Sequence, residues 1–261
     1  MTTGRFAPSP TGPLHRGSLV AAVGSWLCAR RAGGRWLVRM EDLDMPRVIA
    51  GADREILEAL RRFKLEWDGE VVYQSKRLHL YEDALRTLRQ GGFIFDCACS
   101  RADLQRAASA PAQSDPQEPA YPGTCRNGLP PGRAARAIRF RGVDDFVVKR
   151  ADGLFAYQLA VVVDDAAQGV TQVVRGADLL SSTPRQLALQ QSLGYPHPDY
   201  VHLPLVTNPD GTKLGKRDGA LPLPSLDEAH VRETLHWALA FLGIPVELDT
   251  PAQMLKTALK Q

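Results

Sequence analysis

Hydrophobic residues follow two patterns along the first third of the chain: short continuous runs and a stripe at helical spacing. A short apolar run over residues 5–7 stops at Pro8, and another occupies residues 36–38. Between these runs, apolar residues recur at helical spacing from Ser18 as far as the glycine pair 33–34. This stripe consists of Leu19, Val20, Val23, Trp26 and Leu27. The pattern predicts a strand, a helix and a second strand, in that order.

Two further helical stripes follow the second predicted strand. Their apolar positions are Ile49, Ile56, Leu57, Leu60 and Phe63 in one, and Leu78, Tyr81, Leu85 and Leu88 in the other. Strands that alternate with helices favour a parallel sheet covered by helices. We therefore predict an α/β fold, with residues 1–92 as the first half of the sheet domain.

The alternation then breaks. Residues 93–95 predict a strand, and residues 107–122, rich in Ala, Pro, Ser and Gln, predict a long loop. We interpret residues 93–150 as a subdomain inserted before the second half of the sheet domain, residues 151–206. Residues 207–261 are then a loop followed by C-terminal helices.

The predicted second half resumes the α/β pattern. Residues 155–163 are too apolar to be anything but buried, and residues 170–175 and 200–206 predict strands. Thr183 and Pro184 predict the start of a helix that ends before a glycine at position 194, because proline suits the first helical position.

Local signals also mark the C-terminal part. Residues 208–211, Asn-Pro-Asp-Gly, predict a turn. Ser225 and Glu228 have the spacing of a capping box, and the apolar residues that follow predict a helix. These apolar residues are Val231, Leu235 and Leu242.

Composition narrows the class of protein. Of 261 residues, 44% are hydrophobic and 23% are charged. The apolar stretch 19–28 contains Gly24 and Ser25 and is too short to span a bilayer. The N-terminus lacks the basic and hydrophobic regions of a secretory signal. We therefore expect a cytoplasmic protein with no membrane partner.

The 32 Lys and Arg exceed the 29 Asp and Glu only slightly, but the positive charges are clustered. The clusters are Arg30, Arg31, Arg35 and Arg39; Arg133, Arg136, Arg139 and Arg141; Lys149 and Arg150; and Lys213, Lys216 and Arg217. Such clusters can follow a phosphate backbone. Solvated surface is an equal explanation for each single cluster.

The segment PTGPLHRGSL, residues 10–19, joins the first predicted strand to the first predicted helix. A turn ahead of a helix offers backbone N–H groups and the positive end of the helix dipole, which suit phosphate. Gly17, without a side chain, would let a flat adenine ring approach the backbone. His15 would add a hydrogen-bond donor to phosphate oxygens. A histidine in a turn is more often a surface or capping residue.

Three of the 4 cysteines, Cys97, Cys99 and Cys125, are close in sequence. In a cytosolic chain this pattern favours a metal over a disulfide. Thiolates favour zinc, which normally has four ligands in a structural site, and no histidine is nearby to be the fourth. Three reduced cysteines, or a site completed by water, stay open as alternatives. Cys28 lies on the first predicted helix, where we assign it no role.

Four separated motifs resemble the class I aminoacyl-tRNA synthetases in the form found in their glutamyl branch. They are RFAPSPTGPLHRGSL near the start, MEDLD at 40–44, VVRGADLL at 173–180 and KLGKR at 213–217. The first and last resemble the HIGH and KMSKS signatures of that class. The resemblance covers essentially the whole chain. It implies a Rossmann-type catalytic domain with an inserted zinc-binding subdomain, and ATP, with Mg²⁺, as a substrate.

The resemblance also implies which residues bind glutamate, ATP and zinc. They are Arg5, Ser9, Glu41, Tyr157 and Arg175 for glutamate; His15, Gly17, Ser18, Lys213 and Lys216 for ATP; and Cys97, Cys99, Tyr121 and Cys125 for zinc. His15 and Lys216 are the implied catalytic residues. The chemistry agrees for glutamate, because arginine suits its two carboxylates and Glu41 suits its ammonium group.

This sequence departs from the family pattern at two positions. The last residue of the HIGH-type tetrad is Ser18 and not histidine, which leaves His15 as the imidazole donor. Gly215 stands where the KMSKS-type loop usually has serine, so the contact of that hydroxyl is in doubt, whereas Lys216 is retained.

The residues after KLGKR suffice for a helix or two, so we expect no anticodon-binding domain. A truncated branch of the glutamyl family has this organisation. That resemblance implies ATP-dependent activation of L-glutamate to glutamyl-adenylate without tRNA. The glutamyl group would then pass to the queuosine base in the anticodon loop of tRNA(Asp). We expect a monomer.

Three alternatives stay open. A minimal glutamyl-tRNA synthetase would charge the 3′ end, and the short C-terminal part argues against it. A nucleotidylyltransferase also carries an H-x-G-x turn, but the glutamyl context of Arg5, Glu41 and Arg175 argues against it. A non-catalytic tRNA-binding relic is disfavoured because His15 and Lys216 are both present.

Overall fold

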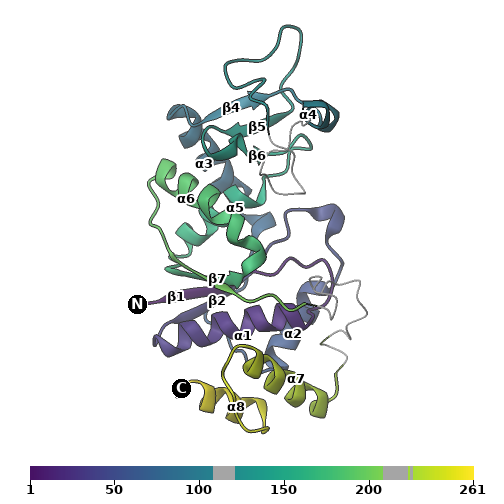
Figure 1. The fold of residues 1–261 in the computed structure, drawn as a ribbon, viewed down its shortest axis with the longest axis vertical. Helices are drawn as coiled ribbons and strands as arrows, with labels where there is room; N and C mark the ends of the chain where they lie inside the picture. The colour runs from purple at the N-terminus through teal and green to yellow at the C-terminus, as the bar shows by residue number, and fades with distance from the viewer. Residues whose placement is uncertain (108–120, 208–222, 224–225) are drawn as a thin grey trace. The chain divides into compact units, whose positions relative to one another are not determined.

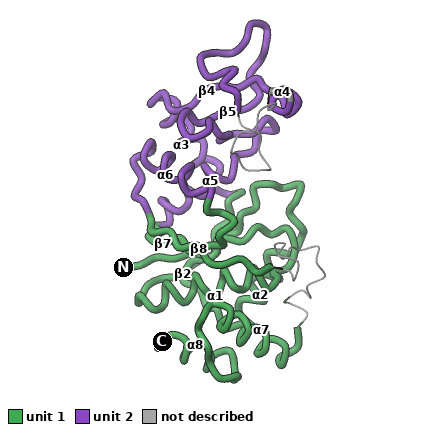
Figure 2. Tube along the Cα trace, in the orientation of Figure 1, with its two compact units in different colours: residues 1–75, 169–180, 198–261 green, residues 76–168, 181–197 purple. Residues whose placement is uncertain are grey.

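The computed structural model divides the chain into two compact units (Figures 1 and 2). It describes residues 1–107, 121–207, 223 and 226–261. Unit 1 comprises residues 1–75, 169–180 and 198–261, and unit 2 comprises residues 76–168 and 181–197. The four-part division inferred from the sequence stays a prediction.

Unit 1 is built on parallel strands. They are β1 (Thr3–Phe6), β2 (Arg35–Met40), β3 (Val72–Tyr73), β7 (Gln172–Gly176) and β8 (Asp199–Leu203). The first three form one sheet in the order β1-β2-β3, and β7 pairs with β8. The N–H of Thr171 donates to the carbonyl of Thr3 at 2.9 Å, which sets the start of β7 beside β1. The predicted α/β fold is confirmed.

In the described part of unit 1, four α-helices accompany these strands. They are α1 (Arg16–Arg31), α2 (Ala52–Arg62), α7 (Glu228–Phe241) and α8 (Pro251–Ala258). Their apolar faces share one core with β1 and β2, in which Leu19, Trp36, Ile56 and Leu235 are fully buried. At Gly24 a Cβ would lie 2.5 Å from Leu203 Cδ1, so glycine lets α1 pack closely on the end of β8.

Several boundaries in unit 1 differ from the sequence expectation. Ile49 precedes α2 and is 54% exposed, because the chain turns at Gly51, with φ 85°, before the helix begins. The N-cap of α7 is Asp227, whose carboxylate accepts from the N–H of His230 at 2.9 Å. The capping box predicted for this helix is therefore wrong. The predicted turn at 208–211 lies outside the described residues.

Unit 2 combines helices with an antiparallel sheet. Its elements are α3 (Leu78–Gln90), β4 (Ile94–Cys97), α4 (Arg101–Ala107), β5 (Ala137–Phe140), β6 (Val147–Lys149), α5 (Tyr157–Ala167) and α6 (Thr183–Leu193). The strand order is β4-β5-β6. The fully buried Asp164 on α5 accepts hydrogen bonds from Arg77 Nε at 2.6 Å and from the Tyr81 hydroxyl at 2.7 Å. This ion pair joins α5 to the start of α3.

Short 3₁₀ turns connect several elements of both units. They span Met45–Arg47, Gln74–Lys76, Val143–Asp145 and Ala177–Ser182. The predicted start of α6 at Thr183 and its end before Gly194, with φ 68°, are confirmed. Among the described residues, no helix has the length and apolar character needed to cross a bilayer.

Candidate functional site

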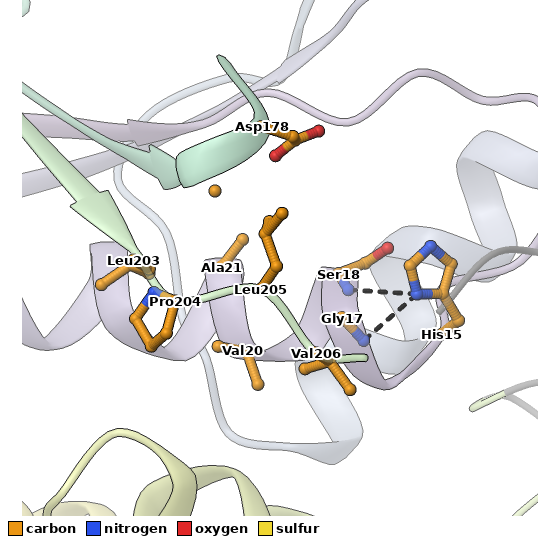
Figure 3. A pocket seen from close by; sticks show the side chains of 11 residues that line it. His15, Gly17, Ser18, Val20, Ala21, Asp178, Leu203, Pro204, Leu205 and Val206 are labelled. Carbon is orange, nitrogen blue, oxygen red and sulfur yellow. Dashed lines mark hydrogen bonds between the residues drawn. The ribbon is translucent and has the colours of Figure 1, made fainter. Parts of the chain in front are cut away.

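The predicted phosphate-binding turn follows β1 and leads into α1 (Figure 3). His15 is the N-cap of α1, and its Nδ1 accepts from the N–H groups of Gly17 at 3.1 Å and Ser18 at 3.3 Å. An accepting Nδ1 carries no proton, so the neutral ring carries its proton on Nε2. The imidazole therefore caps the helix with one nitrogen and has its donor on the other.

This cap changes which groups of the turn can donate hydrogen bonds to an anion. The two N–H groups that the sequence suggested for phosphate are engaged by His15 in this structure. A Cβ at Gly17 would lie 3.1 Å from Cε1 of the His15 ring, so glycine makes room for the histidine. Of the donors that the sequence suggested for a phosphate at this turn, the Nε2–H group of His15 is the one that the helix cap does not use.

A pocket of about 200 Å³ lies beside the turn (Figure 3). His15, Gly17 and Ser18 line it, together with Gly176 and Asp178 from the motif at 173–180. The other lining residues are Val20, Ala21, Leu203, Pro204, Leu205 and Val206. Apolar walls that also include an imidazole and a carboxylate suit a nucleoside, which has a flat base and hydroxyl donors.

Sequence analysis did not assign Asp178 or the segment 203–206 to the site. Asp178 stands inside a motif that was recognised, so its carboxylate could have been proposed as a contact. At Gly176 a Cβ would lie 2.5 Å from Oδ1 of Asp178, which explains the glycine before it. The apolar segment 203–206 carries no comparable signal, because its role depends on the packing of β8 against α1.

Two buried arginines lie on the strands beside this turn. Arg5 on β1 is 3% exposed and Arg175 on β7 is 5% exposed. Arg175 Nε donates to His202 Nε2 at 3.4 Å, and its guanidinium lies 5.0 Å from the Tyr200 ring centroid. Burial, and then the Arg175 charge, lower the pKa of His202 below its usual value. His202 is therefore the neutral acceptor that orients Arg175.

The MEDLD segment is held against the turn that carries Ser9. The N–H of Glu41 donates to the carbonyl of Pro8 at 2.9 Å. The fully buried Arg39 donates to Glu41 Oε1 at 3.4 Å. Asp42 accepts from the N–H of Ser75 at 2.8 Å and from its hydroxyl at 2.6 Å. The buried guanidinium of Arg39 therefore holds the Glu41 carboxylate in place.

The residues predicted for glutamate and ATP do not all belong to the described part of unit 1. Arg5, Ser9, Glu41 and Arg175 all belong to unit 1, whereas Tyr157 is the first residue of α5 in unit 2. Lys213 and Lys216 lie outside the described residues.

The thiol cluster, defined as Cys97, Cys99, Cys125 and Tyr121, gathers in unit 2. The three Sγ atoms lie within 4.8 Å of one another, with Cys99 and Cys125 3.8 Å apart. Tyr121 Oη lies 3.8 Å from Cys97 Sγ and accepts from the N–H of Cys125 at 2.7 Å. Tetrahedral zinc with Zn–S bonds of about 2.3 Å places its sulfur ligands about 3.8 Å apart. The donor set therefore fits zinc.

A buried arginine lies against the thiol cluster. Arg139 Nε donates to Cys97 Sγ at 3.3 Å, and its guanidinium lies 4.0 Å from the Tyr121 ring centroid. Burial raises the pKa of Cys97, but the N–H of Cys99 and the Arg139 cation outweigh it, so that this pKa lies below its usual value. Burial and the Cys97 charge raise the pKa of Cys99 to about 12. A bound dication would deprotonate the thiols outright.

Curated relatives align with most of this chain and are identical to it at more than half of the aligned positions. The chain is 57% identical over 242 residues to the glutamyl-Q tRNA(Asp) synthetase of Geobacter sulfurreducens, which covers 84% of this chain and 77% of that protein. It is 55% identical over 262 residues to the glutamyl-Q tRNA(Asp) synthetase of Dechloromonas aromatica, covering 92% of this chain and 85% of that protein.

The fold also matches a solved structure. The glutamate-tRNA synthetase of Elizabethkingia anophelis superposes with a TM-score of 0.76 at 24% identity, over 98% of this chain. This chain spans 65% of the length of that structure. At this identity the likeness shows the fold alone.

The family of class I tRNA synthetases (E and Q), catalytic domain, matches residues 1–131 and 132–250. This match confirms the resemblance predicted from the four motifs. It implies a ligase whose substrates are an amino acid, ATP and a tRNA. The chain belongs to the class I tRNA synthetases of the E and Q branch.

Proposed function

We propose that the chain activates L-glutamate with ATP and transfers the glutamyl group to the queuosine base in the anticodon loop of tRNA(Asp). The observation that carries this proposal is the identity of 57% and 55%, over most of the chain, to proteins named glutamyl-Q tRNA(Asp) synthetase. The charged residues of the candidate site also support glutamate as the amino acid substrate.

Glutamate brings two carboxylates and one ammonium group. The buried Arg5 and Arg175 supply cations for the carboxylates, and guanidinium binds a carboxylate with two parallel hydrogen bonds. Glu41, held by Arg39, supplies the anion for the ammonium group, with Ser9 as a further polar contact. Tyr157 stays a contact predicted from the family.

In the first step the α-carboxylate oxygen attacks the α-phosphorus of ATP in line. A P–O bond forms to the carboxylate, the bond to the bridging oxygen breaks, and pyrophosphate leaves. His15 Nε2–H donates to the phosphate oxygens, and Lys213 and Lys216 neutralise the pyrophosphate that leaves. Mg²⁺, when bound with ATP, would add positive charge at the same phosphates. The nucleoside occupies the pocket beside His15, with Asp178 near its hydroxyls.

In the second step a hydroxyl on the cyclopentene ring of queuosine attacks the carbonyl carbon of glutamyl-adenylate. The new ester forms, AMP leaves, and the hydroxyl proton passes to solvent. AMP is a good leaving group, so this step depends on alignment more than on a protein base.

The thiol cluster has a structural part in this proposal. Cys97, Cys99 and Cys125, with Tyr121 as fourth ligand, would hold Zn²⁺, which cross-links the end of β4 to the segment around residue 121–125. No catalytic step uses it. That the enzyme is a cytoplasmic monomer stays a prediction.

The proposal is tested by transfer of labelled glutamate, with ATP, to tRNA from cells that make queuosine and from cells that do not. We expect label only in queuosine-containing tRNA(Asp). Label on tRNA(Glu) from both sources would instead establish a synthetase that charges the 3′ end.

Two substitutions of His15 separate its capping role from its phosphate role. Asparagine also caps helices, so His15→Asn should keep the stability and lower glutamate-dependent ATP–pyrophosphate exchange by about 100-fold. His15→Ala should lose the same activity and, in addition, about 1 kcal/mol of stability. Exchange at the wild-type rate in His15→Asn would contradict the role of the imidazole.

A further inference from the structure

Most arginines of the sequence clusters are occupied within the fold. Their partners are Asp68 for Arg30, the carbonyl of Ala258 for Arg31, Glu41 for Arg39, Asp103 for Arg133, Cys97 for Arg139, the carbonyl of Arg126 for Arg141, Glu82 for Lys149 and Asp152 for Arg150. These cations hold elements together, and a polyanion would have to compete with their partners. The surface that meets the RNA must therefore be sought elsewhere.

A different set of cations lines a groove of about 640 Å³ in unit 1. Arg61, Arg62 and Lys64 come from the C-terminal end of α2, and Arg232 comes from α7. The first residues of α8 complete it, and all three helices appear in the lower half of Figure 1. We name this set of residues the basic groove. Glu228 is its one acidic lining residue, against four basic ones.

Three of the four cations of the basic groove, Arg61, Lys64 and Arg232, are exposed to solvent. Arg61 lies over the Trp67 ring, 5.1 Å from its centroid, a contact that orients the guanidinium without neutralising it. Lys64 and Arg232 are exposed, and within the described part of the chain neither forms an ion pair with a carboxylate. Arg62 donates to the carbonyl of Leu226 and anchors the groove to the segment before α7.

The backbone of Lys64 supports a role for this side chain. Its φ of 58° is left-handed, a conformation that favours glycine. Lys64 occupies the position after the cap of α2, where its N–H donates to Arg61 O and the N–H of Leu65 donates to Leu60 O, both at 2.9 Å. This is the Schellman arrangement, in which glycine is the usual residue. The stability of the fold alone would favour glycine at position 64, so the presence of a lysine there suggests a role for its side chain.

We propose that the basic groove binds the phosphodiester backbone of the tRNA substrate, with Lys64 and Arg232 in direct contact with phosphate oxygens. The proposal rests on the proposed function, because it assumes a tRNA substrate. Cations spread over three helices suit a chain of phosphates better than a single phosphate group. The N-terminal end of α8 adds a partial positive charge to the same groove.

The substitution Lys64→Gly tests this proposal because it moves stability and RNA binding in opposite directions. It relieves the left-handed lysine and should raise the Tm by roughly 2–4 °C. It removes one phosphate contact, so KM for tRNA in the glutamate transfer reaction should rise roughly tenfold. The slope of log affinity for tRNA against log salt should become shallower by about one.

Matched variants complete the test. Arg232→Gln should reproduce the loss of tRNA affinity and the change in salt slope. Arg54→Gln removes the same charge from an exposed position at the other end of α2 and should change neither quantity. ATP–pyrophosphate exchange with glutamate should stay at the wild-type rate in all three variants.

Two results would overturn the proposal. One is a higher Tm in Lys64→Gly with KM for tRNA and salt slope unchanged. The other is an equal loss of affinity in Arg54→Gln, which would show diffuse attraction and no specific groove. Failure of the wild-type protein to exchange pyrophosphate with glutamate would instead contradict the proposed function, so the two failures are distinguishable.

Discussion

The apolar core of unit 1 and the thiol cluster of unit 2 are stabilised in different ways. The core draws buried side chains from the helices α1, α2, α7 and α8 and from the strands β1 and β2, among them Leu19 of α1, Trp36 of β2 and Leu235 of α7. Among the described residues, the buried apolar group at the thiol cluster consists of Phe95, Cys97, Ala98 and Cys125, with Cys99 and Tyr121 packed against it. This described group is much smaller than the core of unit 1, so hydrophobic burial contributes less to it.

Polar contacts replace apolar area in the second region. Arg139 bonds Cys97 and donates to the carbonyl of Asp145 at 2.8 Å, while the Asp145 carboxylate accepts from Arg126 at 2.7 Å. Small metal-binding subdomains commonly depend on the ion for their order. The sheet of unit 1 therefore depends on packing, whereas the end of β4 at the thiol cluster depends on charged contacts such as the one between Arg139 and Cys97.

The largest effect is expected from a change in the apolar core. Trp36 stacks on Phe6, with ring centroids 6.2 Å apart, and donates from Nε1 to Ser25 Oγ at 3.0 Å. Trp36→Ala should therefore lower the free energy of unfolding by about 4 kcal/mol. Urea denaturation measures the loss, and Leu248→Ala, at a residue 56% exposed, should change it by less than about 0.5 kcal/mol. Equal effects of the two variants would contradict the importance of this core.

An intermediate and local effect is expected from the thiol cluster. Cys125→Ser should lower the zinc content of the protein, and chelation should mimic it. Amide hydrogen exchange in β4 and β5 should accelerate by at least about tenfold while the strands of unit 1 stay protected.

The half-buried Cys28, outside the thiol cluster, provides the control, because Cys28→Ser should leave the metal content unchanged. A metal content that is the same in Cys125→Ser as in wild type would contradict the zinc site. Acceleration that spreads equally through unit 1 would contradict the difference between the regions.

The smallest effect concerns a titrating group in unit 1. The folded-state pKa of His202 lies below its usual value of 6.5, because of burial and the Arg175 charge. The unfolded chain therefore takes up this proton first as the pH falls, so that the contribution to stability is complete above about pH 6.5 and is lost at lower pH. His202→Gln should make the Tm less dependent on pH between 6.5 and 5, approximate limits that follow from the direction of this shift. Identical Tm profiles for variant and wild type would contradict the coupling.

The two units also differ in how much of their secondary structure could be predicted from the sequence. In unit 1, α1 was predicted because its large apolar residues recur at helical spacing, and β2 was predicted because residues 36–38 form a continuous apolar run. The strand β3 was not, since Val72 and Tyr73 are too short a run to show alternation. In unit 2, β5 and β6 were missed because Arg139 and Lys149 interrupt the apolar pattern, and Arg139 is buried by contacts that arise only on folding.

The sequence by itself determined the family, the alternation of strands and helices, and the residue types that we propose for the glutamate and zinc sites. These follow from local spacing and from motifs, which do not depend on distant partners. Tertiary structure alone decided that His15 caps α1 and that three cysteines and a tyrosine converge. It also decided which cations are engaged, since Arg31 meets the carbonyl of Ala258, 227 residues away. Arg61, Arg62 and Lys64 are neighbours in the sequence, but only the fold brings Arg232 of α7 to the same groove.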